Sequence, residues 1–129
     1  GVERPKILAV TVLTSFDDQG WQEVGGHLPI QEHVLELASL AKSSGVDGVV
    51  ASPKEAGSIR EMAGKDDFLI VTPGIRPSFA QTDDQKRIAT PSQAFKDGSS
   101  MLVIGRPITQ AIDPCAAARL ILKEIKENA

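Results

Sequence analysis

The sequence predicts an α/β protein in which short parallel strands alternate with helices. Four apolar, β-branched runs occupy residues 7–13, 46–51, 68–71 and 101–104. Short runs that are apolar on both faces are typical of a parallel sheet covered by helices. Strand and helix signals alternate four times, and no linker rich in proline, glycine or serine interrupts them. We therefore expect one domain over residues 1–129, either a small open sheet or half of a (β/α)8 barrel, which needs about 250 residues when complete.

Local capping signals predict where the helices between these runs begin and end. Residues 52–55 (SPKE) and 90–93 (TPSQ) each combine an N-cap hydroxyl, proline at the first helical position and a Glu or Gln placed to close a capping box. Gly64 and Gly98 are expected to end these two helices. A further helix ending near Gly45 is predicted by apolar residues at helical spacing: Ile30, Val34, Leu37, Ala38 and Ala41.

The last helix is predicted to begin at Asp113-Pro114. Leu120, Ile121 and Ile125 are expected to face inward from it. The single cysteine, Cys115, lies beside three alanines, so we expect a small buried helix residue rather than a catalytic thiol. One cysteine also excludes an internal disulfide and a cysteine-based zinc cluster.

Composition excludes several classes of protein. Fourteen Lys and Arg against seventeen Asp and Glu give a net charge of −3, and aromatic residues make up only 4%, which argues against a nucleic-acid surface. Hydrophobic residues at 41% and charged residues at 24% are typical of soluble globular proteins. No apolar run approaches the roughly 20 residues of a membrane-spanning helix, and the first residues lack the apolar core of a signal peptide. We expect a cytoplasmic protein without membrane or nucleic-acid partners.

Two loops carry the strongest functional signal. In parallel α/β folds ligands bind at the carboxyl ends of the strands. The third apolar run is followed there by Gly74 and Arg76, and the fourth by Gly105 and Arg106. Glycine lets backbone N–H groups approach a ligand, and the arginine fork suits phosphate oxygens. One such loop alone would more often place its arginine in a surface ion pair, but two in succession favour a phosphate site, as after the last two strands of a barrel.

Other candidate residues favour structural roles. His27 and His33 are expected to be solvated, and no clustered carboxylate makes them a metal site. Asp17-Asp18 more often begins a helix than binds a metal, and Ser15 and Ser52 are expected to act as caps or hydrogen-bonding groups. We expect no lysine, histidine or carboxylate at the ligand-facing end of any strand. The pattern thus predicts a protein that holds a phosphorylated ligand without transforming it.

Five segments together resemble one enzyme family. They are LAVTVLTS (8–15), DGVVASPKEA (47–56), VTPGIRP (71–77), DDQKR (83–87) and VIGRPITQAIDP (103–114). In this order they resemble the C-terminal half of bacterial orotidine 5′-phosphate decarboxylases. The resemblance implies strands five to eight of a TIM barrel from a homodimeric enzyme that converts orotidine 5′-monophosphate (OMP) to UMP in pyrimidine synthesis without a cofactor.

The resemblance also implies roles for individual residues. Arg76 and Arg106 would bind the phosphate, helped by the backbone at Gly105. Gln85 would connect phosphate and pyrimidine from the long loop that closes over the substrate in this family. Thr14 would contact the substrate where the two active sites of the dimer approach each other.

The catalytic Asp-x-Lys-x-x-Asp motif of the family does not occur in the sequence. The nearest string, 84–86 (DQK), has Ala89 where the second aspartate should be. We therefore expect a half-barrel fragment without catalytic residues, inactive alone, whose partner is the N-terminal half of the barrel. The alternative is a half-barrel module for ligand binding or assembly, while DDQKR and VLTS argue against a related sugar-phosphate decarboxylase. Because the half-barrel would expose two strand edges, we also expect it to self-associate or rearrange.

Overall fold

The sheet has four parallel strands in chain order. The computed structural model describes residues 1–65, 67–79 and 89–128. Its strands are β1 (Leu8–Val10), β2 (Gly48–Val50), β3 (Leu69–Thr72) and β4 (Met101–Leu102), ordered β1-β2-β3-β4. This confirms the predicted α/β class. The strands are shorter than the apolar runs, which continue beyond them: Val12, for example, follows the end of β1 and is buried.

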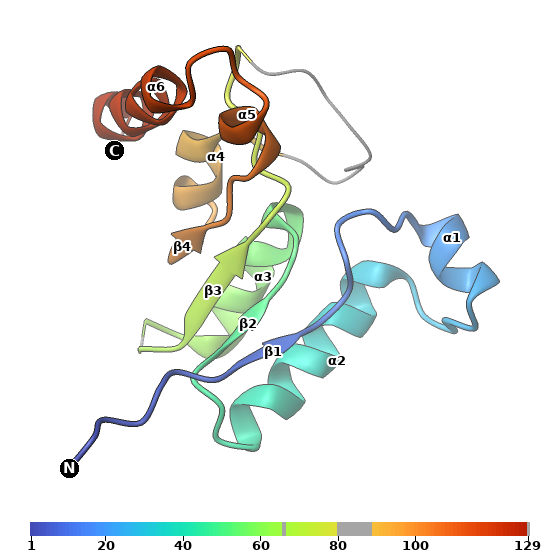
Figure 1. The fold of residues 1–129 in the computed structure, drawn as a ribbon. Helices are drawn as coiled ribbons and strands as arrows, with labels where there is room; N and C mark the ends of the chain where they lie inside the picture. Colours follow the sequence, from blue (N-terminus) through green and yellow to red (C-terminus); the bar gives the residue numbers. More distant parts are fainter. Residues whose placement is uncertain (66, 80–88, 129) are drawn as a thin grey trace.

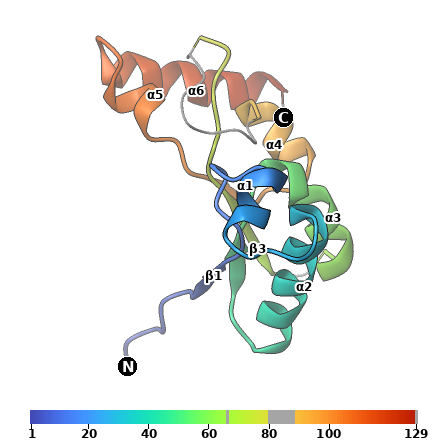
Figure 2. The same cartoon turned by 90° about the vertical axis from the view of Figure 1, so that its right-hand side faces the viewer.

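The helices lie mainly on one side of this sheet. They are α1 (Asp18–Glu23), α2 (Ile30–Ser43), α3 (Pro53–Ala63), α4 (Pro91–Lys96), α5 (Arg106–Thr109) and α6 (Pro114–Asn128). Figures 1 and 2 show α2 and α3 against one face of the strands, while the opposite face is open. Among the described residues, no helix has the length and apolar character needed to cross a membrane.

The hydrophobic core lies between the sheet and α2 and α3. Ala9, Val49 and Ile70 are in register across β1, β2 and β3, and their side chains face this core. The buried residues of α2 recur at helical spacing: Ile30, Val34, Ala38 and Ala41. This spacing predicted the helix from the sequence. Burial of these four residues against the sheet stabilises α2.

The capping signals predicted the helix starts correctly. Ser52 Oγ accepts a hydrogen bond from the backbone N–H of Lys54 at 3.1 Å, and Thr90 Oγ1 accepts one from Gln93 at 3.3 Å. Asp113 Oδ1 accepts from the N–H of Ala116 at 3.0 Å, before α6. Each side chain satisfies one of the backbone donors that a helix start leaves without an intrahelical partner.

Three expectations about the C-terminal third were wrong. Cys115 is exposed rather than buried, and of the predicted inward-facing residues Leu120 is 53% exposed, whereas Ile121 is 4% exposed. Successive residues of a helix point about 100° apart, so a helix packed on one side buries only one of two neighbours. Residues 106–109 form the short helix α5, where the sequence predicted only a loop.

Candidate functional site

The loop after β3 is held at its base by backbone pairing within this chain. Arg76 N–H donates to the carbonyl of Ala89 at 3.0 Å, and Ala89 N–H donates to the carbonyl of Gly74 at 3.4 Å. The result is a parallel bridge between Ile75 and Ala89. Gly74 has φ 73°, a conformation that side chains rarely adopt, which explains the glycine at this position. The start of the loop is therefore fixed relative to the sheet.

Arg76 is buried at the base of this loop. It is 8% exposed, and its Nη1 donates to the carbonyl of Ile75 at 3.2 Å. Among residues 1–65, 67–79 and 89–128, no carboxylate lies within 4 Å of its guanidinium. Removing a cation from water is costly unless an anion or hydrogen bonds compensate it. The described carboxylates therefore do not compensate the charge of Arg76.

The loop after β4 contributes the second arginine. Arg106 is half-buried at the first position of α5, directly after Gly105. A Cβ built on Gly105 would meet no other atom of the described chain within 4 Å. Packing within the described chain therefore does not require glycine here, whereas the close approach of a ligand to the backbone would.

Strand order brings the two arginine-bearing loops together. β3 and β4 are parallel neighbours, with Val71 paired to Met101 and Thr72 to Leu102. Their carboxyl ends therefore lie at the same edge, so Arg76 and Arg106 leave adjacent strands in the same direction. Beneath them, the hydroxyls of Thr72 and Ser99 are hydrogen-bonded at 2.9 Å in a buried pair that ties β3 to the turn before β4.

The remaining predicted site residues are not part of this pair of loops. Thr14 is 4% exposed and follows β1, at the far edge of the sheet from β4. It shares the ligand-facing end with the arginines but is two strands from β3. Gln85 lies outside the described residues.

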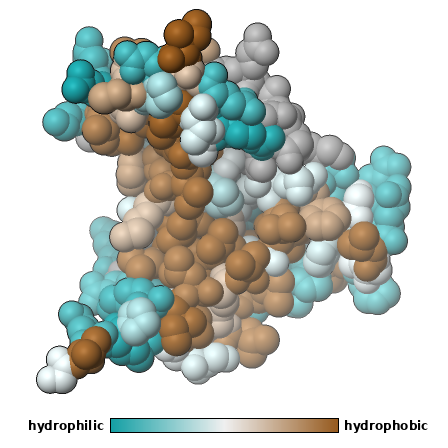
Figure 3. Space-filling view, in the orientation of Figure 1, coloured by the Kyte–Doolittle hydropathy of each residue, from teal (hydrophilic) through white to brown (hydrophobic). Residues whose placement is uncertain are grey.

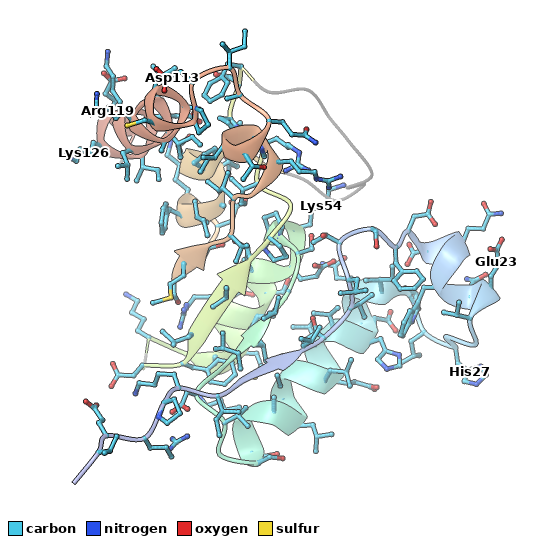
Figure 4. The ribbon with its side chains drawn as sticks, in the orientation of Figure 1. Glu23, His27, Lys54, Asp113, Arg119 and Lys126 are labelled. Carbon is cyan, nitrogen blue, oxygen red and sulfur yellow. The ribbon has the colours of Figure 1, made fainter. Side chains whose placement is uncertain are left out.

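The expectation that no ionisable side chain lies at the ligand-facing end was wrong. Lys54 and Glu55 are in the first turn of α3, which begins directly after β2. A helix that follows a strand starts at the carboxyl end of that strand, so its first turn belongs to the ligand-facing end. Lys54 is exposed there, and Figure 4 shows it at the upper end of α3, while Glu55 is 3% exposed. The sequence did contain a signal for this. The segment SPKE (52–55) directly follows an apolar run, so its lysine and glutamate must lie near the carboxyl end of that strand.

Asp17 and Asp18 have structural roles, as the sequence predicted. Asp17 Oδ1 accepts from the N–H of Gly20 at 2.8 Å and caps α1. Asp18 Oδ1 accepts from the N–H of Ile30 at 2.8 Å and thereby caps α2, whose own N-cap residue is Pro29. Within the described ranges, no group of three or more potential metal-ligating side chains comes together.

The two histidines differ in their surroundings. His27 is exposed, as predicted. His33 is half-buried, with its ring edge-on to Trp21 at a centroid distance of 5.3 Å, so the expectation of a solvated side chain was wrong for it. Helical periodicity places His33 next to the buried Val34 but does not reveal that α1 folds back over it.

The fold belongs to the β/α-barrel class. Its four parallel strands correspond to about half of a complete eight-stranded barrel. Residues 2–121 match the sequence profile of the Orotidine 5'-phosphate decarboxylase / HUMPS family, and the chain belongs to this family. A relative from Geotalea daltonii, called orotidine 5'-phosphate decarboxylase, is 60% identical over 125 residues, which are 97% of this chain and 52% of the relative. The family resemblance seen in the sequence is thus confirmed.

Two solved structures of this family are also similar to the chain. The crystal structure of orotidine 5'-phosphate decarboxylase from Lactobacillus acidophilus superposes with a TM-score of 0.78 at 50% identity, covering 97% of this chain and 51% of that protein. The enzyme of the same name from Pyrococcus horikoshii gives a TM-score of 0.58 at 29% identity over 75% of this chain. The chain spans about half the length of the relatives that it matches.

Proposed function

We propose that this chain is the phosphate-binding half of an orotidine 5'-phosphate decarboxylase. The complete enzyme would decarboxylate OMP to UMP in pyrimidine synthesis, as a homodimer and without a cofactor. In this proposal the chain binds the nucleotide, and the N-terminal half of the barrel supplies the catalytic groups. Family membership and the two arginine-bearing loops support it.

The observation that carries the proposal is the burial of Arg76. Its guanidinium is largely removed from water, and the described residues place no carboxylate within ion-pair distance of it. A phosphate group would supply a negative charge beside it and accept two parallel hydrogen bonds from the arginine fork. The neighbouring loop would add Arg106 and the open backbone at Gly105, so that one phosphate is held from two strands.

The other roles follow from the resemblance. Thr14 would contact the nucleotide from the far edge of the sheet. Gln85 would connect the phosphate to the pyrimidine, although it lies outside the described residues. Phosphate binding contributes to catalysis at a distance, because binding energy from a non-reacting group is used to close the site and stabilise the transition state.

The isolated chain is expected to be inactive in decarboxylation. The sequence contains no Asp-x-Lys-x-x-Asp motif, and the family places its proton-donating lysine and the accompanying aspartates in that motif. Lys54 at the ligand-facing end does not replace the motif, because no aspartate stands two residues before it or three residues after it. Holding OMP and transforming it are thus separate tasks of the two halves.

Calorimetric titration with UMP tests the phosphate site. Arg106→Ala should weaken UMP binding by about tenfold or more, as expected for the loss of a charge-assisted contact worth about 1.5–3 kcal/mol. Arg119→Ala, an exposed arginine on α6, is the matched control and should bind like the unaltered chain. Equal affinities for Arg106→Ala and the unaltered chain would show that the phosphate assignment is wrong.

A second candidate function is a half-barrel module for ligand binding or assembly without catalysis. The absence of the catalytic motif from the sequence is the observation that favours it. Mixing the chain with a separately produced N-terminal half of the Geotalea daltonii relative and assaying OMP decarboxylation distinguishes the two. Recovered activity supports the enzyme half, whereas complex formation without activity supports the module.

A further inference from the structure

A buried pair of hydroxyl groups lies beneath the two arginine-bearing loops. Thr72, the last residue of β3, and Ser99, in the turn before β4, are hydrogen-bonded through their hydroxyl oxygens at 2.9 Å. Thr72 is 0% exposed and Ser99 is 7% exposed. Side chains alternate along a strand, so Thr72 points to the same side of the sheet as the core residue Ile70. The pair therefore lies between the sheet and the helices.

Apolar groups surround this pair. Ile70 and Ala94 are buried, and the backbone N–H of Ser99 donates to the carbonyl of Ala94 at 3.0 Å. Figure 3 shows a hydrophobic band over the opposite face of the sheet. In apolar surroundings a hydrogen bond is strong, and a hydroxyl that loses its partner is costly. The two side chains are thus held to each other.

The ladder that joins β4 to β3 is short. β4 pairs through its two residues with the last two residues of β3, and the N–H of Val103 then donates to the carbonyl of Thr72 at 3.0 Å. Because Ser99 precedes β4 and Thr72 ends β3, their hydroxyl bond runs diagonally across this ladder. A diagonal side-chain link resists sliding of β4 along β3, in addition to the two ladder pairs.

The turn before β4 is also held from α3. Arg60 Nη2 donates to Ser100 Oγ at 2.9 Å, and the same oxygen accepts from the N–H of Ile70 at 3.0 Å. These bonds fix the start of β4 against α3 and the middle of β3. The bond between Thr72 and Ser99 connects that fixed start to the end of β3, from which the first arginine-bearing loop leaves.

We propose that the Thr72 hydroxyl is a positioning group of the phosphate site, which sets the loop of Arg76 relative to the loop of Arg106. Arg76 stands four residues after Thr72, and Arg106 three residues after Val103, whose N–H is bonded to Thr72. Thr72 is therefore joined to the bases of both loops. This inference rests on the proposed function, because it assumes that one phosphate is held from both. Two arginines bind one phosphate well only when both are held within about 0.5 Å of the productive geometry.

A double-mutant cycle with Arg106 tests this role by calorimetric titration with UMP. Thr72→Val keeps the shape of the side chain but removes the hydroxyl, and it should weaken UMP binding about fivefold, which is about 1 kcal/mol. Thr72→Ser keeps the hydroxyl and should bind within about twofold of the unaltered chain. In the Arg106→Ala background, Thr72→Val should not change the affinity further, because no second arginine is left to position. A purely stabilising hydroxyl would not show this dependence on Arg106.

Thr11→Val is the matched control. Thr11 Oγ1 donates to the carbonyl of Val50 at 2.8 Å beyond the end of β1, so this substitution also removes a hydroxyl and its hydrogen bond. It should leave the affinity for UMP unchanged. Circular dichroism checks that each variant is folded under the titration conditions. If Thr72→Val does not fold, Ser99→Ala removes the other hydroxyl of the pair and takes its place in the cycle.

The possible results separate this inference from the proposed function. Unchanged UMP affinity in Thr72→Val, together with weakened binding in Arg106→Ala, would overturn the inference and leave the proposed function standing. Equal losses in Thr72→Val and Thr72→Ser, or in Thr72→Val and Thr11→Val, would also overturn it, because the Thr72 hydroxyl would not be the cause. Additive losses from Thr72→Val and Arg106→Ala would overturn it as well. Unchanged binding in Arg106→Ala would overturn the proposed function and this inference with it.

Discussion

Replacing Arg76 with methionine separates the ligand-binding role of this side chain from its effect on stability. Methionine keeps most of the length and volume of the side chain but removes the charge. Arg76 is 8% exposed as a residue, so its side chain loses most of its hydration, and the described protein partner of its guanidinium is the carbonyl of Ile75 at 3.2 Å. Replacing a buried ion pair by apolar groups of similar volume is often neutral or stabilising by about 1–4 kcal/mol, and we expect a similar gain where the described residues give the buried charge no ion-pair partner. Losing the charged hydrogen bond to Ile75 offsets about 1.5–3 kcal/mol of that gain.

The expected effects of Arg76→Met therefore differ with and without ligand. Without ligand, the free energy of unfolding should stay within about 1 kcal/mol of the unaltered chain or rise above it. With UMP at about 100 times its dissociation constant, the unaltered chain should gain about 2.7 kcal/mol. Arg76→Met should lose nearly all of this gain, because the buried positive charge that attracts the phosphate is gone.

Urea unfolding followed by circular dichroism measures both quantities, at one fixed chain concentration and with saturating or no UMP. Arg119→Met is the control, because the same substitution at an exposed arginine should change the unfolding free energy by no more than about 0.5 kcal/mol and leave the UMP gain intact. A loss of more than about 2 kcal/mol without ligand, combined with an unchanged UMP gain, would refute the reasoning. Arg76 would then be a structural residue whose charge is already compensated.

Three further predictions concern one residue of the proposed site and two residues that stabilise the fold. Gly105→Ala should leave the unfolding free energy within about 0.5 kcal/mol, because the built Cβ meets no described atom, but should weaken UMP binding in a calorimetric titration. Asp18→Ala should cost about 1 kcal/mol in urea unfolding and Asp18→Asn much less, because only the latter keeps the oxygen that caps α2. The N–H of Ile7 and the guanidinium of Arg4 hold the pKa of Asp47 below its ordinary value of 3.8, so its ionised form stabilises the fold. Asp47→Asn should accordingly lower stability at neutral pH, and urea unfolding should show this difference closing as the pH falls below about 3.8.

Local chemistry explains which parts of the fold could be predicted from the sequence. Ser52 and Thr90 cap their helices through atoms two or three residues away, so the signal and its effect lie in the same short stretch. The positions of Arg76 and Arg106 followed from one general property of parallel sheets, that the loops after neighbouring strands meet at one edge. These predictions needed no knowledge of the tertiary contacts.

Other features depend on contacts that no local pattern records. The cap on α2 comes from Asp18, twelve residues before Ile30, so the sequence around Pro29 does not reveal it. Leu120 fits the helical spacing of a core residue, but α6 packs on one side only and leaves it exposed. The burial of Arg76 likewise could not be predicted, because arginine in a polar loop is usually solvated.

The position of the site within the half-barrel predicts how the chain alone discriminates between ligands. The two arginine-bearing loops follow β3 and β4, and the loop of Arg76 is held by a bridge to Ala89 of the same chain. The proposed phosphate contacts are thus assembled within this half. Thr14 instead follows the edge strand β1, and the remaining contacts to the pyrimidine would come from the half that the chain lacks.

The chain alone should therefore bind the phosphate of a nucleotide and make little use of the base. Inorganic phosphate and UMP should have dissociation constants within about fivefold of each other, a difference of about 1 kcal/mol in binding free energy. Uridine, which lacks the phosphate, should show no measurable binding in the same calorimetric titration. If UMP binds about a hundredfold more tightly than phosphate, this half already contacts the base. The proposal that this half binds the phosphate and the other half binds the pyrimidine would then be wrong. If the prediction holds, the affinity for the pyrimidine should appear only when the N-terminal half is added, because only then is the wall of the barrel that faces Thr14 complete.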